Sequence, residues 1–395
     1  MAIFAAFSGS CHPEIKPMKE GVWRGVFLLP SHEIPFKFEV KGSGAAKTSV
    51  FLINGEDRFE LKKVAYSNDS VTIPIDLYDA VLKGRLTTNS FSGQLVKSGN
   101  SVPFMAEYGN LPRFTESREA PALSLNGSWD IQIITPADTD KTVGNFDQKG
   151  SLLTGSILTI SGDYRFFEGV VQGKKFSLSA FGGSTPYLLK GEFLTDSTFV
   201  GEFVTPRQTS SIAGKRNPKA ALPDPYAASH LKEGYSSVAF SFPNLGGKLV
   251  SLSDPPYQGK VVIVTILGSW CPNCLDENAF LSGWYKENHH RGIEIIGLGF
   301  ERKNDFESAK KSLSSLKTRL DIQYEILFAG KAGTEAASRA LPALNSISAF
   351  PTTIFIDRKG KVRKVHTGFS GPATGKFFEA FKVEFNELID QLLAE

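Results

Sequence analysis

Two cysteines with two residues between them, Cys271 and Cys274, are the clearest candidates for chemistry in this chain. A close pair of thiols can exchange electrons with a disulfide, can supply two ligands to a zinc ion, or can be accidental. The 395 residues contain one further cysteine, Cys11, so disulfide bonds are not what holds the domains together. The pair therefore indicates redox or metal chemistry.

The surroundings of the pair favour redox chemistry. The run 260–267 is continuously apolar, which is typical of a strand buried on both faces, and we expect a helix from the cysteines to about His289. The free N–H groups and the macrodipole at the start of a helix stabilise an anion. We therefore expect Cys271 to attack a disulfide as a thiolate and Cys274, one turn deeper, to resolve the mixed disulfide. Pro272 suits the first helical turn, where its missing N–H is not needed.

Zinc binding is the main alternative for the pair. Structural zinc normally has four Cys or His ligands, and the sequence offers no second cysteine pair. His289 and His290 follow about four helical turns later, too far away to complete the ligand shell. We therefore expect neither a metal nor a bound cofactor.

Strand-like and helix-like segments alternate after the pair. We expect strands at 293–298, 324–328, 350–357 and 361–366, and helices at 305–316, 334–341 and 374–393. The last two strands read as a hairpin that turns at 358–360. This alternation predicts a mostly parallel central sheet covered by helices.

The segment Gly268-Ser-Trp270-Cys271-Pro-Asn-Cys274 and the run Phe350-Pro351-Thr-Thr-Ile-Phe-Ile-Asp357 together resemble the TlpA/ResA branch of the thioredoxin-like proteins, which are envelope thiol–disulfide reductases. The resemblance covers about 235–395 and implies an α/β thioredoxin-like domain. It also implies that a cis proline at Pro351 faces the dithiol and leaves backbone free to pair with a partner; a plain turn proline is the alternative. We expect the substrate groove to be lined by Trp270, Pro272, Asn273, Phe350 and Pro351.

The resemblance extends to one carboxylate, with two departures. Glu277 stands six residues after the first cysteine, where ResA-like proteins have a glutamate, and it is expected to assist proton movement at Cys274. A solvated helix residue is the alternative. Thr265 stands where ordinary thioredoxin has a buried aspartate, so proton transfer to the second cysteine must come from another group or from water. Asn278 replaces the usual proline of the family, which leaves the shape of the helix open.

The N-terminal half has a different pattern, with alternating apolar and polar residues and turn residues at hairpin spacing. Four short motifs recur at offsets of 106 to 108 residues. They pair Gly21-Val-Trp23 with Gly127-Ser-Trp129, 55–59 with 162–166, 82–84 with 189–191, and 91–93 with 199–201. We therefore predict two related all-β modules, 20–115 and 122–215, each a small barrel or sandwich. Trp23 and Trp129 are expected in their cores; ligand binding by these modules stays open.

A proline-rich linker at 216–234 is expected to join the modules to the thioredoxin-like domain, 235–395. Residues 1–19 resemble the end of a bacterial lipoprotein signal with lipid on Cys11, although the basic start is missing; a stub with a free thiol is the alternative. The net charge of +3 is too small to indicate nucleic acid.

The expected function is dithiol–disulfide exchange, as a reductase, with protein disulfides on the outer side of a bacterial membrane. Electrons would arrive from an upstream dithiol donor, and lipid on Cys11 would attach the chain to the membrane. A second hypothesis is an envelope binding or assembly protein whose β repeats bind a partner. A redox-inactive docking fold is a third. A peroxiredoxin-type peroxidase is disfavoured, because the dithiol lacks the signature Pro-x-x-x-Thr-x-x-Cys.

Overall fold

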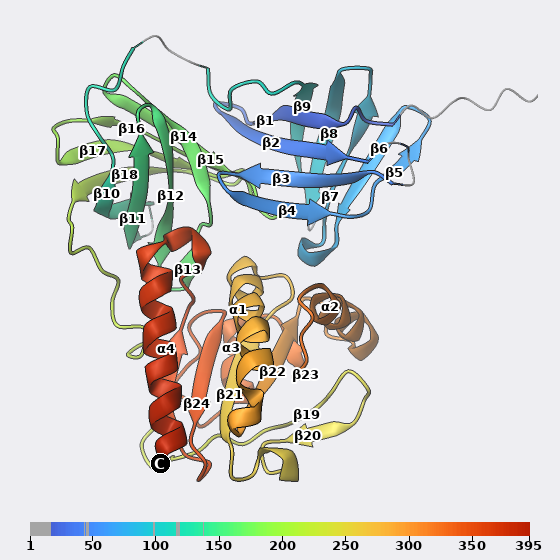
Figure 1. The fold of residues 1–395 in the computed structure, drawn as a ribbon, viewed down its shortest axis with the longest axis vertical. Coiled ribbons are helices and arrows are strands. Elements are labelled where there is room, and N and C mark those ends of the chain that lie inside the picture. The colour runs from blue at the N-terminus through green and yellow to red at the C-terminus, as the bar shows by residue number, and fades with distance from the viewer. Residues whose placement is uncertain (1–16, 43, 45–46, 98, 116–118, 137) are drawn as a thin grey trace, which may run out of the picture.

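The computed structural model describes residues 17–42, 44, 47–97, 99–115, 119–136 and 138–395. Two β-rich sheets lie over one end of an α/β domain that carries the C-terminus (Figure 1). We keep the name module 1 for the sheet β1–β9 and module 2 for the sheet β10–β18. Among the described helices, none is long and apolar enough to cross a membrane.

Module 1 is a nine-stranded antiparallel sheet with the order β4-β3-β2-β1-β9-β8-β7-β6-β5. Its first strand pairs with both the second and the last. Within the described residues its two end strands, β4 and β5, do not pair with each other, so the sheet is open. The strands are β1 (Gly21–Leu28), β2 (Glu33–Lys41), β3 (Ser49–Asn54), β4 (Asp57–Leu61), β5 (Ala65–Ser67), β6 (Ser70–Ile75), β7 (Ala80–Leu86), β8 (Ser90–Lys97) and β9 (Asn100–Tyr108), with a 3-10 turn η1 (Asp76–Tyr78).

Module 2 follows the same path, but β12 pairs with both β11 and β14, so its sheet closes into a barrel. The short β13 pairs only with the end of β12, so the turn around it projects from the barrel. The strands are β10 (Gly127–Ile134), β11 (Thr139–Lys149), β12 (Leu152–Thr159), β13 (Gly162–Asp163), β14 (Phe167–Gln172), β15 (Lys175–Ala180), β16 (Tyr187–Phe193), β17 (Thr198–Val204) and β18 (Thr209–Arg216). Trp23 and Trp129 are both fully buried in their modules.

The C-terminal domain is built on a five-stranded sheet with the order β23-β22-β21-β24-β25. Its strands are β21 (Val261–Leu267), β22 (Ile293–Glu301), β23 (Glu325–Lys331), β24 (Thr352–Ile356) and β25 (Val362–Thr367), preceded by a small hairpin of β19 (Ser241–Pro243) and β20 (Leu249–Ser251). β21 lies at the centre with every residue buried, as its apolar run predicts. The helices are α1 (Pro272–Asn288), α2 (Phe306–Arg319), α3 (Thr334–Ala340) and α4 (Lys376–Ala394).

The expectation of a mostly parallel sheet is wrong. β21, β22 and β23 are parallel, but β24 runs antiparallel to β21 and β25 antiparallel to β24. The predicted β22 and α2 are also too short, since β22 continues to Glu301 and α2 to Arg319. β22 continues because its last residues, Gly299 to Glu301, are buried between neighbouring elements and still follow the strand pattern.

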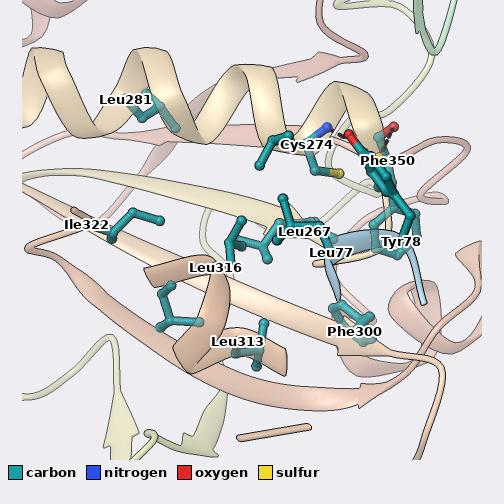
Figure 2. Packing of buried hydrophobic residues seen from close by; sticks show 14 of the residues in the cluster. Leu77, Tyr78, Leu267, Cys274, Leu281, Phe300, Leu313, Leu316, Ile322 and Phe350 are labelled. Atoms are coloured by element: carbon teal, nitrogen blue, oxygen red, sulfur yellow. Dashed lines mark hydrogen bonds between the residues drawn. The ribbon is translucent and has the colours of Figure 1, made fainter. Parts of the chain in front are cut away.

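Module 1 packs directly on the C-terminal domain. Leu77 and Tyr78 belong to the same buried apolar cluster as Leu267, Phe300 and Phe350 of that domain (Figure 2). The three parts of the chain therefore meet at the end of the sheet where α1 begins.

Candidate active site at the start of helix α1

The two predicted cysteines lie where the strand β21 gives way to the helix α1. Cys271 is the N-cap of α1, and its Sγ accepts a hydrogen bond from the backbone N–H of Cys274 at 3.3 Å. Both thiols are free, with Cys271 5% exposed and Cys274 fully buried. The Cys271 thiol lies 3.6 Å from the carbonyl oxygen of Phe350, whose peptide bond to Pro351 is cis. The dithiol and the proline segment, about eighty residues apart in the sequence, therefore face each other.

The two sulfurs have different surroundings. Burial raises the pKa of the Cys274 thiol well above its ordinary value, and the neighbouring Cys271 and the charge of Glu277 act in the same direction. Cys274 therefore keeps its proton until a nearby group accepts it. Cys271 instead accepts a backbone N–H bond in the first turn of the helix, where the N–H groups have no partner within the helix.

Glu277 is 2% exposed, so the interpretation as a solvated helix residue is wrong. Its Oε2 accepts a hydrogen bond from the Thr265 hydroxyl and its Oε1 one from the Thr353 hydroxyl, both at 2.6 Å. Burial raises the pKa of Glu277 to about 7, although the two hydroxyl groups oppose the shift. A carboxyl group with this pKa can hold or release a proton near neutral pH.

Asn278 does not disturb the helix. Its side chain is fully buried, donates to the Cys274 carbonyl at 2.8 Å and accepts from the Tyr324 hydroxyl at 2.8 Å. α1 continues through this position without a break. The departure from the family's proline is therefore accommodated by two buried hydrogen bonds.

Trp270 and Phe350 form one wall beside the dithiol. The Trp270 indole donates to the Phe300 carbonyl at 2.9 Å, and its ring centroid lies 5.6 Å from that of Phe350. A side chain at Gly268 would place its Cβ 2.4 Å from the Trp270 indole nitrogen, so only glycine fits beneath this ring.

Sequence reasoning missed Glu301, which holds the loop before the cysteines. Its carboxylate accepts from the Ser269 backbone N–H at 2.8 Å and from the Ser269 hydroxyl at 2.7 Å. Glu301 is 4% exposed, and burial raises its pKa. A charged residue at the end of a buried strand was the available signal.

Pro272 and Asn273, predicted in the substrate groove, lie at the boundary with module 2. The Asn273 amide donates to the Ser161 carbonyl and accepts from the Asp163 backbone N–H, both at 3.4 Å. The side chain between the cysteines is thus in contact with the turn around β13.

Further residues that the sequence did not indicate surround this turn. Arg165 forms an ion pair with Asp276 of α1 at 3.2 Å, and its guanidinium lies 3.4 Å from the Tyr78 hydroxyl of module 1. The only sequence signal was the recurrence of Arg58 at Arg165 in the repeat. Cys11, the predicted lipidation site, lies outside the described residues.

No group of three or more His, Cys, Asp or Glu side chains in the described part of the chain could hold a metal ion. His289 and His290 form a 3-10 turn at the far end of α1, away from the dithiol.

A free thiol pair that opens the helix after a central strand, opposite a cis proline, defines a thioredoxin-like redox domain. Residues 232–380 match the Redoxin family, so the C-terminal region is a Redoxin domain.

The relatives include several proteins named thiol–disulfide oxidoreductase ResA. The Bacillus subtilis (strain 168) protein "Thiol-disulfide oxidoreductase ResA" is 29% identical over 140 residues, 35% of this chain and 69% of the relative. "Thioredoxin-like protein YneN" of the same organism is 25% identical over 138 residues, 35% of this chain and 73% of the relative. A crystal structure of a putative thiol:disulfide interchange protein DsbE from Chlorobium tepidum is 21% identical, covers 39% of this chain and 98% of that one, and has a TM-score of 0.30.

Proposed function

We propose that this chain is a thiol–disulfide oxidoreductase that reduces disulfides of partner proteins in a bacterial envelope. The observation that carries the proposal is the position of Cys271 Sγ, which accepts the Cys274 N–H at 3.3 Å at the start of α1. The ResA-like relatives support the type of reaction. The direction, the protein partners, the envelope location and the lipid on Cys11 are parts of the proposal that rest on the family resemblance.

The reaction runs in two exchanges. The Cys271 thiolate attacks one sulfur of the substrate disulfide, forms a mixed disulfide and releases the other substrate sulfur as a thiolate, which takes up a proton. Cys274 then gives up its proton and attacks Cys271 Sγ, which forms the Cys271–Cys274 disulfide and releases the second substrate thiol. Two electrons pass to the substrate, and a donor dithiol restores the reduced pair by the same exchange in reverse.

Glu277 accepts the proton of Cys274 in this scheme. The thiol needs help because burial holds its pKa high, and Glu277 is the buried carboxylate whose charge acts on it. Thr265 and Thr353 fix the carboxylate from two neighbouring strands, so it does not need a solvent shell. Trp270, Phe350 and the cis Pro351 frame the groove in which the substrate binds, and Pro272 and Asn273 form its edge.

We further propose that the two β modules are copies of one ancestral unit, with boundaries at 20–115 and 122–215, and that residues 216–234 link them to the domain 235–395. Equivalent hydrogen bonds in the two modules support a common origin. The Trp23 indole donates to the carbonyl four residues earlier at 2.9 Å, and the Trp129 indole does the same at 2.8 Å. The recurring glycines also face each other in both sheets, Gly84 with Gly93 and Gly191 with Gly201.

The test is reduction of insulin by dithiothreitol with purified chain as the catalyst. We expect the wild type to accelerate precipitation of the insulin B chain and Cys271→Ser to be indistinguishable from buffer. An equal rate for wild type and Cys271→Ser would remove the enzyme proposal. Equilibration of the dithiol with glutathione would then give its reduction potential, and a value well above that of thioredoxin would contradict the reductase direction.

A further inference from the structure

Segments of both N-terminal modules contact the C-terminal domain beside the dithiol. Cys271 is 5% exposed although it is the proposed attacking group, and Arg165 of module 2 contacts both Asp276 of α1 and Tyr78 of module 1. We propose, on the basis of the proposed function, that residues 160–165 of module 2 and Tyr78 of module 1 form a movable cover, and that Arg165 determines which disulfides reach Cys271 by holding this cover closed.

The turn around β13 lies on the loops that frame the dithiol. The backbone N–H of Asp163 donates to the Asn273 amide oxygen, and the Asp163 carboxylate accepts the backbone N–H of Gly371 at 2.8 Å. A Cβ at Gly368 would lie 2.3 Å from the Ile160 carbonyl oxygen, so the two backbones are in close contact. Gly368 in turn donates to the carbonyl of Pro351 at 2.8 Å. The turn therefore packs against the segment that leads from the proline, next to where an incoming polypeptide would bind.

Arg165 is held in an uncommon conformation that directs it at the C-terminal domain. Its φ of 63° is in the left-handed region, which is rare for a long side chain, and its N–H is fixed by the Asp163 carboxylate at 2.6 Å. The guanidinium pairs with Asp276 at 3.2 Å, with both side chains only 15% exposed. Asp57 of module 1 adds a further charge that acts on Arg165. Arg165 thus forms an ion pair with the C-terminal domain, and its charge is also stabilised by nearby carboxylates of modules 1 and 2.

Tyr78 closes the cover from the other side. It is fully buried, and the residue after it, Asp79, also has a left-handed φ of 49°. Its carbonyl lies 3.5 Å from the Arg302 guanidinium of the C-terminal domain, and its hydroxyl lies 3.4 Å from that of Arg165. The two cover segments therefore contact each other as well as the domain below them.

The junction is suited to opening. A cavity of about 150 Å³ remains between the three parts, lined by residues that include Asn54, Tyr78, Tyr164, Arg165, Pro272 and Asn273. Side chains beside a cavity lack packing partners, so separating them loses less dispersion energy than separating a close-packed interface. Residues 160–165 contact α1 through the polar side chains of Asn273 and Asp276, and Arg165 supplies the ion pair with Asp276, so its removal leaves that buried carboxylate unpaired.

The test measures how fast Cys271 reacts in the full, reduced chain. The rate of alkylation at Cys271 is followed by peptide mapping, once with iodoacetamide and once with a maleimide on a bulky polyethylene glycol. Insulin reduction is measured in parallel. The opening variants are Arg165→Gln, which removes the cation, and Gly162→Ala, whose Cβ would lie 2.1 Å from the Asn273 amide nitrogen at a φ of 142°.

Each opening variant has a matched control. Gly150→Ala changes another positive-φ glycine of module 2 with nothing within 4 Å of its Cβ, and Arg165→Lys keeps the charge. We expect both opening variants to raise the bulky-reagent rate at least about tenfold, more than the iodoacetamide rate, and to speed insulin reduction. We expect Gly150→Ala to match the wild type and Arg165→Lys to lie close to it. If circular dichroism shows that Arg165→Gln does not fold, the alkylation rate of Gly162→Ala decides the test.

The outcomes separate the cover from the chemistry. Equal alkylation rates in wild type and both opening variants would overturn the cover, while insulin reduction by the wild type would leave the proposed function standing. Faster alkylation in variants that reduce no insulin would support the cover and remove the proposed function. A rate increase of the same size in Gly150→Ala would also overturn the cover, because any loosening of module 2 would then be sufficient.

Discussion

The hydroxyl of Thr265 donates a hydrogen bond of 2.6 Å to Glu277, so the central strand fixes a carboxyl group that the helix α1 supplies. Thioredoxin places an aspartate on that strand, and here a threonine on the strand and a glutamate on the helix together occupy the region below the dithiol. The acidic residue below the dithiol therefore lies on the helix in this chain and on the strand in thioredoxin. Four predictions follow from this arrangement and from the dithiol above it.

Glu277→Gln should lower the rate of insulin reduction about a hundredfold, because Cys274 loses its proton acceptor. In the wild type the rate should rise with pH through about 7, where Glu277 becomes ionised, and this limb should be absent in the variant. Turnover measured from pH 5 to 9 checks both points. Glu287→Gln, at an exposed position of the same helix, should keep the wild-type rate and profile. An unchanged profile in Glu277→Gln would assign the proton to another group.

The same carboxyl group should make stability depend on pH. Because burial raises the pKa of Glu277 from 4.5 to about 7, the folded state binds its proton more tightly than the unfolded state does. The resulting stabilisation is fully present below about pH 4.5 and is lost as the pH rises through 7, a difference of about 3 kcal/mol. Urea unfolding at pH 5 and pH 8 should show a smaller difference for Glu277→Gln. Part of the dependence should persist, since burial also raises the pKa of Asp276 to about 7.

Thr353→Val should move the active pH range upward. The valine removes a hydroxyl that stabilises the ionised carboxylate, so the pKa of Glu277 should rise further, by roughly one unit for a hydrogen bond to a charged group. Thr265→Val should act in the same direction from the other oxygen. The pH–rate profile of insulin reduction reports the shift. Thr367→Val, which removes a buried hydroxyl bonded to Ser229 instead, should leave the midpoint in place.

Cys274→Ser should trap the substrate. Cys271 still attacks, but no second sulfur resolves the mixed disulfide, so an adduct of the chain with an insulin chain should accumulate on non-reducing gels. Mass spectrometry of the adduct should locate the bond at Cys271. Cys271→Ser should form no such adduct. The reverse pattern, with an adduct on Cys274, would exchange the two roles.

The dithiol and its strand and helix could be predicted because their signals are local. The apolar run before Cys271, the proline at the first helical position and the spacing to Cys274 all act within one strand–turn–helix unit. The direction of β24 could not be predicted in the same way. A strand with every residue buried reads alike whether its neighbour runs parallel or antiparallel, so only the connection decides.

The cover could not be predicted because it depends on how separate parts pack. The contact joins one residue from each part of the chain: Tyr78 of module 1, Arg165 of module 2 and Asp276 of α1. Successive members are about ninety residues or more apart in the sequence. Nothing in the spacing of a tyrosine, an arginine and an aspartate indicates that they meet. The sequence predicted a small barrel or sandwich for each module, but not that the pairing of β12 with β14 closes module 2 while module 1 stays open.

The order of the three parts along the chain has a consequence for biosynthesis. Domains generally fold as they emerge from the ribosome, N-terminal first. Tyr78 and Arg165 are therefore made, and their sheets can fold, before Cys271 is translated. If the proposed cover forms in this order, Cys271 would be shielded from stray oxidants as soon as α1 folds.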